Sequence, residues 1–155
     1  MEITIPGHTT MTIKHLVLDF NGTIARDGIL MSNLDRTLCE VAERLTVHVI
    51  TADTGGTVVQ ELEGLPCQLI TIDSGSEEEQ KSSYIRKLGA EHVICFGNGY
   101  NDSLMLETAA IGVAVLEGEG VSINALQSAD ILCRSIYDAF GLIMVPQRLV
   151  ATLRR

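Results

Sequence analysis

Short apolar segments alternate with amphipathic segments along most of the chain. The apolar segments are nearly continuous and rich in β-branched residues, which is typical of strands buried on both faces of a parallel sheet. They cover residues 15–20, 46–51, 67–73, 92–97, 111–116 and 130–134. We therefore predict six core strands.

The segments between these strands have the spacing of amphipathic helices. In residues 32–45, apolar side chains recur three and four positions apart, so one face of a helix would carry them. Ser32 with Asp35, and Ser76 with Glu79, have the spacing of a capping box, so each serine is predicted to cap a helix. The other predicted helices cover about residues 55–63, 76–88, 101–109, 119–127 and 136–144.

The alternation predicts an α/β fold, a three-layer sandwich with a mainly parallel, Rossmann-like sheet covered by helices on both faces. Residues 1–18 differ from this rhythm, and a PGH turn candidate there predicts a β-hairpin that leads into the first core strand. Pro146 ends the predicted helix at 136–144, and the tail, residues 146–155, is predicted to form one more short helix. No linker is apparent, so we predict a single domain over residues 1–155.

Composition narrows the classes of function. A chain of 155 residues with 46% hydrophobic residues can form a full core. No apolar run approaches the roughly 20 residues that span a bilayer, and the N-terminus does not resemble a signal peptide. The formal net charge of −9 argues against nucleic acid, because phosphate binding needs clustered Lys and Arg. We expect a cytoplasmic protein without a membrane or nucleic-acid partner.

Cysteine and histidine residues are scattered along the sequence. None of the four cysteines forms a CxxC motif or has a histidine at zinc-ligand spacing, which favours free thiols in a reducing compartment. A disulfide between two of them is the alternative, because the sequence alone does not give the distances between the thiols. The four histidines are isolated, and we interpret them as core or surface residues rather than ligands.

Polar residues follow several predicted strands at their carboxyl ends, where open α/β sheets bind ligands. Asp19 ends the first core strand, Thr51 the second and Asp73 the third, and GNGYND at residues 97–102 follows the fourth. Each of these segments alone is equally well explained as a turn or a helix cap. Asp53 in particular is interpreted as a helix cap or as a residue that acts indirectly.

In combination and in this order, the motifs resemble the haloacid dehalogenase superfamily. The resemblance rests on DFNGT at 19–23, on Thr51, on Lys81 and on GNGYND at 97–102, and it covers about residues 14–135. Within the superfamily the chain is most similar to the phosphorylation domain of P-type ATPases, as a free-standing soluble version. TAD at 51–53 and GNGYND at 97–102 both resemble motifs of that branch.

The resemblance implies a phosphoryl-transfer site. Asp19 would be the nucleophile that forms an aspartyl-phosphate, Thr51 would donate its hydroxyl to a phosphoryl oxygen, and Lys81 would neutralise negative charge. Further phosphate-binding groups are expected at Phe20, Asn21, Gly22, Ala52 and Asn101.

The same resemblance implies a magnesium site. The ligands would be Asp19, the backbone carbonyl of Asn21, Asn98 and Asp102, an oxygen-only set of the kind that Mg²⁺ prefers. Simpler alternatives remain for some of the site residues. Asn101 and Asp102 could cap a helix, and Thr51 could be only the last residue of its strand.

For Lys81 the alternative is an exposed pair with Glu77, four positions earlier on the same predicted helix. A receiver-like domain phosphorylated by a kinase would also use Asp, Thr and Lys at strand ends. It normally has an acidic pair after the first strand, which Phe20-Asn21 does not supply.

Two positions depart from the family pattern. Asn21 stands where phosphatases of this superfamily have the Asp that protonates the leaving group, and Asn98 stands where a metal-binding Asp is usual. An amide has no titratable proton, so we expect slow turnover, least so on acyl phosphates and phosphoanhydrides. The alternative is a catalytically weak or inactive domain that binds phosphate or a partner protein.

The intervals between the motifs leave no room for a cap domain, because one strand–helix unit fills each of them. The predicted protein is therefore a capless Mg²⁺-dependent phosphohydrolase or phosphotransferase, acting on a small phosphorylated molecule or a phosphoprotein. Residues 2–18 and 146–155 are the candidate surfaces for self-association.

Overall fold

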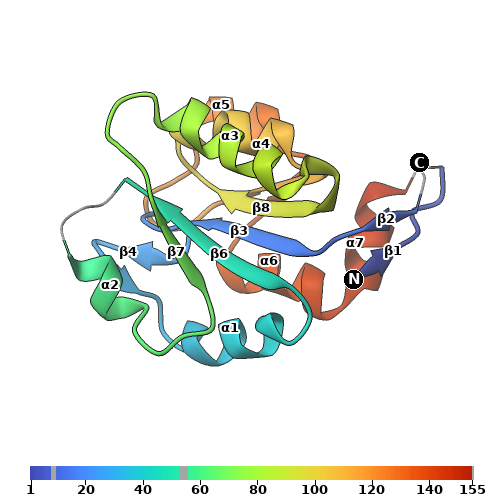
Figure 1. Cartoon of the computed structure of the whole chain (residues 1–155). Coiled ribbons are helices and arrows are strands. Elements are labelled where there is room, and N and C mark those ends of the chain that lie inside the picture. The colour runs from blue at the N-terminus through green and yellow to red at the C-terminus, as the bar shows by residue number, and fades with distance from the viewer. Residues whose placement is uncertain (8–9, 53–55, 155) are drawn as a thin grey trace.

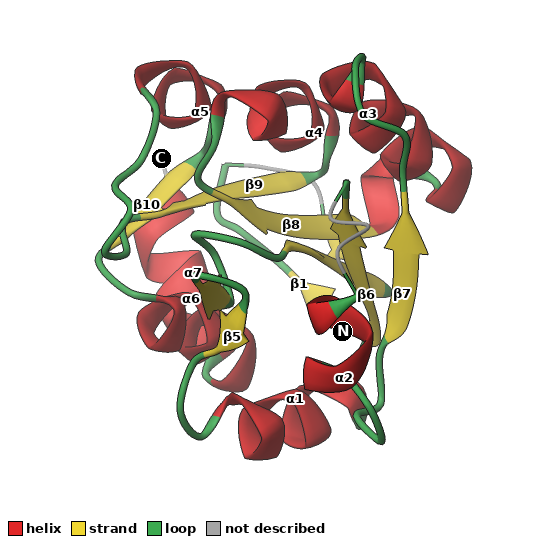
Figure 2. Cartoon of the chain, turned by 90° about the vertical axis from the view of Figure 1, so that its left-hand side faces the viewer, coloured by secondary structure: helices red, strands yellow, loops and turns green. Residues whose placement is uncertain are grey.

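A six-stranded parallel sheet forms the centre of the molecule (Figures 1 and 2). Its strand order is β10-β9-β8-β3-β6-β7. The structure is a computed structural model, and it describes residues 1–7, 10–52 and 56–154. The strands are β3 (His15–Asp19), β6 (Thr46–Thr51), β7 (Gln68–Thr71), β8 (Val93–Gly97), β9 (Ile111–Val115) and β10 (Ile131–Cys133). Strand β3 lies between β6 and β8, so the carboxyl ends of these three strands meet at one edge.

Helices cover both faces of the sheet (Figures 1 and 2). On one face lie α3 (Glu77–Leu88), α4 (Ser103–Thr108) and α5 (Ile123–Ser128), and on the other lie α1 (Leu34–Ala42) and α6 (Ile136–Met144). Successive side chains of β3 point to opposite faces of the sheet, so this strand contributes to the apolar cores on both sides. Leu16 and Leu18 pack on the side of α1 and α6, and Val17 packs on the side of α3, α4 and α5. The predicted α/β class with a parallel sheet is confirmed.

The first strands and the last helix lie on the same side of the molecule in Figure 1. Strands β1 (Glu2–Ile3) and β2 (Met11–Thr12) form the predicted antiparallel N-terminal hairpin. Its predicted turn includes His8, which lies outside the described residues. A final helix, α7 (Pro146–Leu153), follows α6 directly. Among the described residues, no single helix has both the length and the apolarity to cross a membrane, and α6 with α7 reaches them only as a pair bent by 100°.

Several predicted helix starts are wrong. Helix α1 begins at Leu34, and Asn33 precedes it in the left-handed region with φ of 62°, so Ser32 is not its cap. Ser76 precedes α3 but has φ of 66° and makes no capping hydrogen bond, so the predicted box with Glu79 does not form. Side-chain capping requires an extended backbone at the cap, and these residues do not have it.

The predicted helix at 119–127 also begins late. Helix α5 starts at Ile123, where the hydroxyl of Ser122 accepts the N–H of Ala125 at 3.1 Å. The preceding residues are not helical, because Glu117 and Gly120 form an isolated antiparallel bridge. The predicted helix at 55–63 is shorter in the structure, where α2 covers Thr57–Glu61, and Asp53 lies outside the described residues. Two short 3₁₀ helices, Ala90–His92 and Tyr100–Asp102, complete the fold.

A second small hairpin was not predicted. Strands β4 (Ala25–Arg26) and β5 (Ile29–Leu30) pair antiparallel around a two-residue turn, and we call residues 25–30 the 25–30 hairpin. The turn residues Asp27 and Gly28 have φ of 52° and 79°. Such turns favour Asp-Gly, so the dipeptide was the local signal for this hairpin.

Candidate active site

The carboxyl edge of the sheet holds a polar cavity of about 350 Å³. It lies where β3 ends at Asp19, β6 ends at Thr51 and the loop after β8 begins. The residues that line it are Asp19, Asn21, Thr51, Ala52, Glu77, Lys81, Asn98, Gly99, Asn101 and Glu119. Most of the predicted site residues are therefore brought together. Glu77 and Glu119 were not predicted, because neither belongs to a motif that follows a strand.

Lys81 is the centre of the charged network. Its Nζ atom donates to Asp19 Oδ1 at 2.6 Å and to Asp102 Oδ1 at 2.7 Å, and the residue is only 1% exposed. Helix α3 packs across the sheet and directs this side chain at the end of β3. The alternative of an exposed pair with Glu77 is wrong, because the Glu77 carboxylate instead accepts a hydrogen bond from the Asn101 amide.

Two carboxylates share this single lysine, so the buried network has more negative than positive charge. Burial and the neighbouring Asp102 raise the pKa of Asp19 to about 7, although Lys81 acts in the opposite direction. Burial lowers the pKa of Lys81, but the two carboxylates raise it well above its usual range. The lysine therefore stays protonated, and Asp19 lacks a full countercharge.

Asp102 holds the loop after β8. Its Oδ2 atom accepts the backbone N–H of Asn98 at 2.9 Å and that of Gly99 at 2.8 Å, while Oδ1 accepts Lys81. The residue is completely buried and does not line the cavity. Both of its oxygens thus have protein partners, and in this arrangement the carboxylate orients Lys81 and the loop.

Thr23 is a site residue for which no role was predicted. It is completely buried, and its hydroxyl lies 3.2 Å from both Asp19 Oδ2 and Asn98 Oδ1. The last position of the DFNGT motif was the available signal. Gly22, just before it, has φ of 81°, and a Cβ atom there would collide with the Asn98 amide, so this position requires glycine.

The two asparagines that depart from the family pattern each bind a loop. Asn21 Oδ1 accepts the N–H of Gly28 at 3.1 Å, and Asn98 Nδ2 donates to the carbonyl of Gly120 at 3.0 Å. A carboxylate at position 98 could not donate that hydrogen bond. The amide groups therefore have structural partners of their own.

The remaining predicted residues differ in position. Phe20 is buried in the core, and its carbonyl accepts the N–H groups of Ile24 and Ala25. Asp73 does not line the cavity, and its backbone binds the Gln80 side chain. Among the described residues, no three His, Cys, Asp or Glu side chains form a ready metal cluster. All four cysteines have free thiols.

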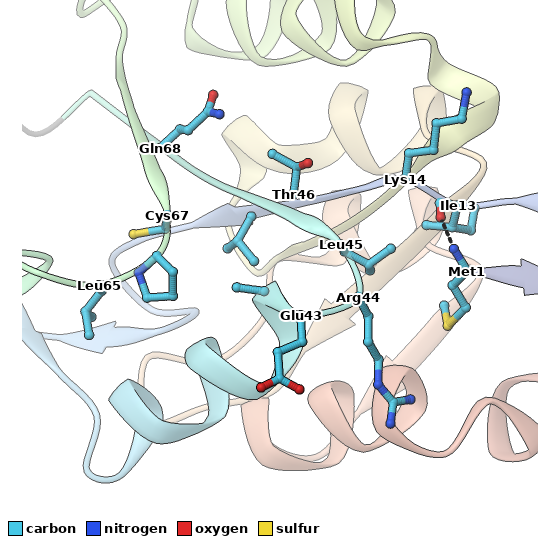
Figure 3. Close-up of a pocket in the computed structure, with 13 residues that line it drawn as sticks. Met1, Ile13, Lys14, Glu43, Arg44, Leu45, Thr46, Leu65, Cys67 and Gln68 are labelled. Atoms are coloured by element: carbon cyan, nitrogen blue, oxygen red, sulfur yellow. Dashed lines mark hydrogen bonds between the residues drawn. The ribbon is translucent and has the colours of Figure 1, made fainter.

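A second cavity, of about 610 Å³, lies at the amino end of the same strands (Figure 3). Apolar side chains such as Leu45 and Leu65 line it together with Lys14, Glu43 and Arg44. The Arg44 guanidinium already donates to the carbonyls of Ile143 and Met144. Arg44 thus already has partners within the chain. The buried charged network of Asp19, Lys81 and Asp102 lies at the opposite, carboxyl edge of the sheet.

Parts of the chain match known proteins in sequence. A family model of haloacid dehalogenase-like hydrolases matches residues 80–138. An uncharacterized protein of Methanocaldococcus jannaschii is 37% identical over 84 residues, which is 52% of this chain and 90% of that protein. The copper-transporting ATPase ccc2 of Schizosaccharomyces pombe is 32% identical over 88 residues, which is 56% of this chain and 9% of that protein.

Solved structures have the same fold. A 3-deoxy-D-manno-octulosonate 8-phosphate phosphatase from Moraxella catarrhalis, in complex with a magnesium ion, a phosphate ion and a KDO molecule, superposes with a TM-score of 0.66 at 16% sequence identity. The match covers 92% of this chain and 94% of that chain. At this identity the likeness concerns the fold alone.

Proposed function

Because the chain belongs to the haloacid dehalogenase-like hydrolases, we propose that it is a phosphohydrolase or phosphotransferase that works through an aspartyl-phosphate on Asp19. The observation that carries this proposal is the contact of Lys81 Nζ with Asp19 Oδ1 at 2.6 Å beside a polar cavity. A carboxylate at a strand end, exposed to a cavity and held by a buried ammonium group, is positioned for attack on phosphorus.

The residues present fit a magnesium ion. The network of two carboxylates and one lysine lacks positive charge, and oxygen atoms of Asp19 and Asn98 lie around the Thr23 hydroxyl. Asp19, the Asn21 carbonyl and Asn98 would hold the ion, with Asp102 as a ligand only if it exchanged a present partner. Bound Mg²⁺ would supply charge neutralisation for the phosphoryl group.

The chain's own residues would share the remaining work. Lys81 would bind a phosphoryl oxygen while it orients Asp19, and the Thr51 hydroxyl with the N–H of Ala52 would bind others. Thr51 is 4% exposed and lines the cavity, as these roles require. The Asn101 amide would also bind a phosphoryl oxygen if its hydrogen bond to the Glu77 carboxylate were broken.

The proposed substrates are small phosphorylated molecules, in line with the phosphatase of similar fold. We propose a capless enzyme with slow turnover, because the Asn21 amide cannot exchange a proton with the leaving group or with water. General acid–base catalysis commonly contributes about 10²–10⁴-fold.

The test compares the wild-type protein with Asp19→Asn on p-nitrophenyl phosphate and acetyl phosphate in the presence of Mg²⁺. We expect Asp19→Asn to lower the rate at least about 10³-fold, because the nucleophile is lost. Asp73→Asn is the matched control, since Asp73 also follows a strand but does not line the cavity. Equal activity of the wild-type protein and Asp19→Asn would refute the proposal.

A second candidate function is a phosphate-binding module without turnover. The engagement of Asn21 with Gly28 and of Asn98 with Gly120 favours it, because both amides serve structure. Beryllofluoride with Mg²⁺ would raise the melting temperature of an enzyme that forms a phospho-aspartate, and Asp19→Asn would abolish that rise. A rise with inorganic phosphate alone, without phosphorylation of Asp19, would favour the module.

A further inference from the structure

Strand β7 lies at the outer edge of the sheet, and Figure 2 shows no further strand beyond it. Residues 67–72, CQLITI, contain neither a charged residue nor a proline, which are common means by which an edge strand avoids pairing with another chain. The opposite edge strand, β10, has only three residues and is flanked by Asp130 and Arg134. The edge at β7 is therefore the one that favours a further strand.

The free backbone groups of β7 belong to Leu69 and Thr71. The N–H of Ile72 donates to the carbonyl of Thr51 at 3.0 Å, and Thr71 is the residue that pairs with Thr51. In this parallel register the even-numbered residues of β7 direct their N–H and C=O groups to β6, so those of Leu69 and Thr71 point to the open side. Within the described residues these two donors and two acceptors have no partner.

A groove of about 340 Å³ lies beside β7, between Ile72 and one face of α3. Glu79 and Lys87 of α3 line it and lie about 12 Å apart along the helix. Helix α3 begins at the carboxyl edge of the sheet, where Glu77 lines the cavity, and runs toward the amino edge. Glu79 thus lies near the carboxyl end of β7 and Lys87 near its amino end. Neither side chain forms an ion pair with another described residue.

We propose that this edge binds a second copy of the chain, whose own β7 pairs with it in antiparallel orientation about a two-fold axis at Ile70. In this register Leu69 of each copy lies opposite Thr71 of the other. Each of these two pairs exchanges two backbone hydrogen bonds, so all the free groups of both strands become paired. The two Ile70 side chains, which are half-buried in the single chain, lie opposite each other on the side of α3.

Charge complementarity selects a second copy as the partner. Because the two strands run in opposite directions, the carboxyl end of one β7 lies beside the amino end of the other. Glu79 of each copy therefore faces Lys87 of the other, which gives two pairs of opposite charge. A two-fold interface requires a surface that is complementary to itself, and this arrangement of an acidic and a basic residue about a central apolar one meets that requirement. The proposal is independent of the chemistry at Asp19.

Sedimentation velocity over a range of protein concentrations tests the pairing. For the wild-type chain we expect a reversible dimer. Thr71→Pro should weaken it at least about 100-fold, because two of the four backbone hydrogen bonds across the axis are lost. Proline is tolerated on an edge strand where the N–H points outward, so the single chain should still fold. Hydrogen exchange should show the amides of Leu69 and Thr71 slowed in the dimer and fast after dilution.

Charge exchange on α3 tests the partner and its orientation. Glu79→Lys and Lys87→Glu should each weaken the dimer about 10-fold, because like charges then meet twice across the axis. The double variant should recover the wild-type affinity, since the charges are opposite again. Arg86→Glu is the matched control for Lys87→Glu, because Arg86 is exposed on the same turn but does not line the groove, and it should leave the affinity unchanged.

A chain that stays monomeric at every concentration would overturn the inference. So would a dimer whose affinity is insensitive to Thr71→Pro and to both charge variants, as expected if residues 2–18 or 146–155 formed the interface instead. A double variant weaker than either single variant would exclude the antiparallel arrangement. If Thr71→Pro did not fold, the charge variants and the exchange of the Leu69 amide would decide the question.

Discussion

Two polar networks, one buried and one partly buried, lie on the same face of the sheet and use the same three elements, β3, β6 and α3. At the carboxyl edge, Lys81 of α3 binds Asp19 at the end of β3, close to Thr51 of β6. Toward the amino edge, Tyr84 of α3 binds His48 Nδ1 at 2.9 Å, and His48 Nε2 lies 3.1 Å from His15 Nδ1.

The networks differ in charge. The amino-edge network pairs its groups in neutral form, because burial and His15 lower the pKa of His48 to about 4. In the carboxyl-edge network, burial and the excess carboxylate of Asp102 raise the pKa of Asp19 to about 7. The neutral groups of the amino-edge network satisfy one another by hydrogen bonds and need no ligand. A site with uncompensated negative charge beside a cavity favours binding of a cation. Charge balance therefore distinguishes the amino-edge network, which stabilises the fold, from the carboxyl-edge network, which is the candidate active site.

Removal of the lysine should have the largest effect on stability. Lys81→Met leaves two buried carboxylates without a countercharge, so the free energy of unfolding should fall by about 3–5 kcal/mol. Urea denaturation at neutral pH, with chelator present, measures the change. Adding Asp19→Asn to this variant should recover part of the loss. A double variant no more stable than Lys81→Met would contradict the shared-charge account.

The two networks should respond to pH with opposite signs. The pKa of His48 is lower in the folded protein than its ordinary 6.5, so stability is lost as the pH falls from 6.5 toward 4. The pKa of Asp19 is higher than its ordinary 3.8, so its contribution to stability rises as the pH falls from 7 toward 4.

Melting temperatures between pH 7 and pH 5, measured with chelator, would separate these contributions. Asp19→Asn should make the decline on acidification steeper than in the wild-type protein, because the opposing gain is absent. His48→Phe should make the decline shallower. Parallel curves for the two variants would show that the networks do not differ in the way proposed.

The smallest expected effect concerns a single neutral hydrogen bond. Tyr84→Phe removes the hydroxyl that binds His48 and should lower the free energy of unfolding by about 1 kcal/mol. Tyr100→Phe is the control, because Tyr100 is 58% exposed and should tolerate the loss. Chemical denaturation of both variants measures the difference, and equal stability would contradict the role of the Tyr84 hydroxyl.

Local pattern was sufficient to predict most of the fold. Six strands were expected from their apolar composition, and all six are present in one parallel sheet. The capping boxes at Ser32 and Ser76 were wrong because the spacing of polar residues does not determine backbone dihedral angles. The 25–30 hairpin was missed, although Asp27-Gly28 is a turn signal, because its strands are only two residues long.

The candidate site was predicted in part. Asp19 and Thr51 are the last residues of their strands and Asn98 follows one, and the rule for parallel sheets brings such residues to one edge. Glu77 and Glu119 could not be predicted in this way, because α3 and the loop after β9 bring them to the cavity only through packing.

By itself the sequence determined the parallel sheet, the edge at which chemistry would occur and the residues that could supply it, since these depend on periodicity and on the order of motifs. Only the tertiary structure decided whether Lys81 paired with Glu77 on the surface or with Asp19 and Asp102 in the interior. The energy of a charged side chain depends on its burial and on partners distant in sequence, and these are set when α3 packs against the sheet.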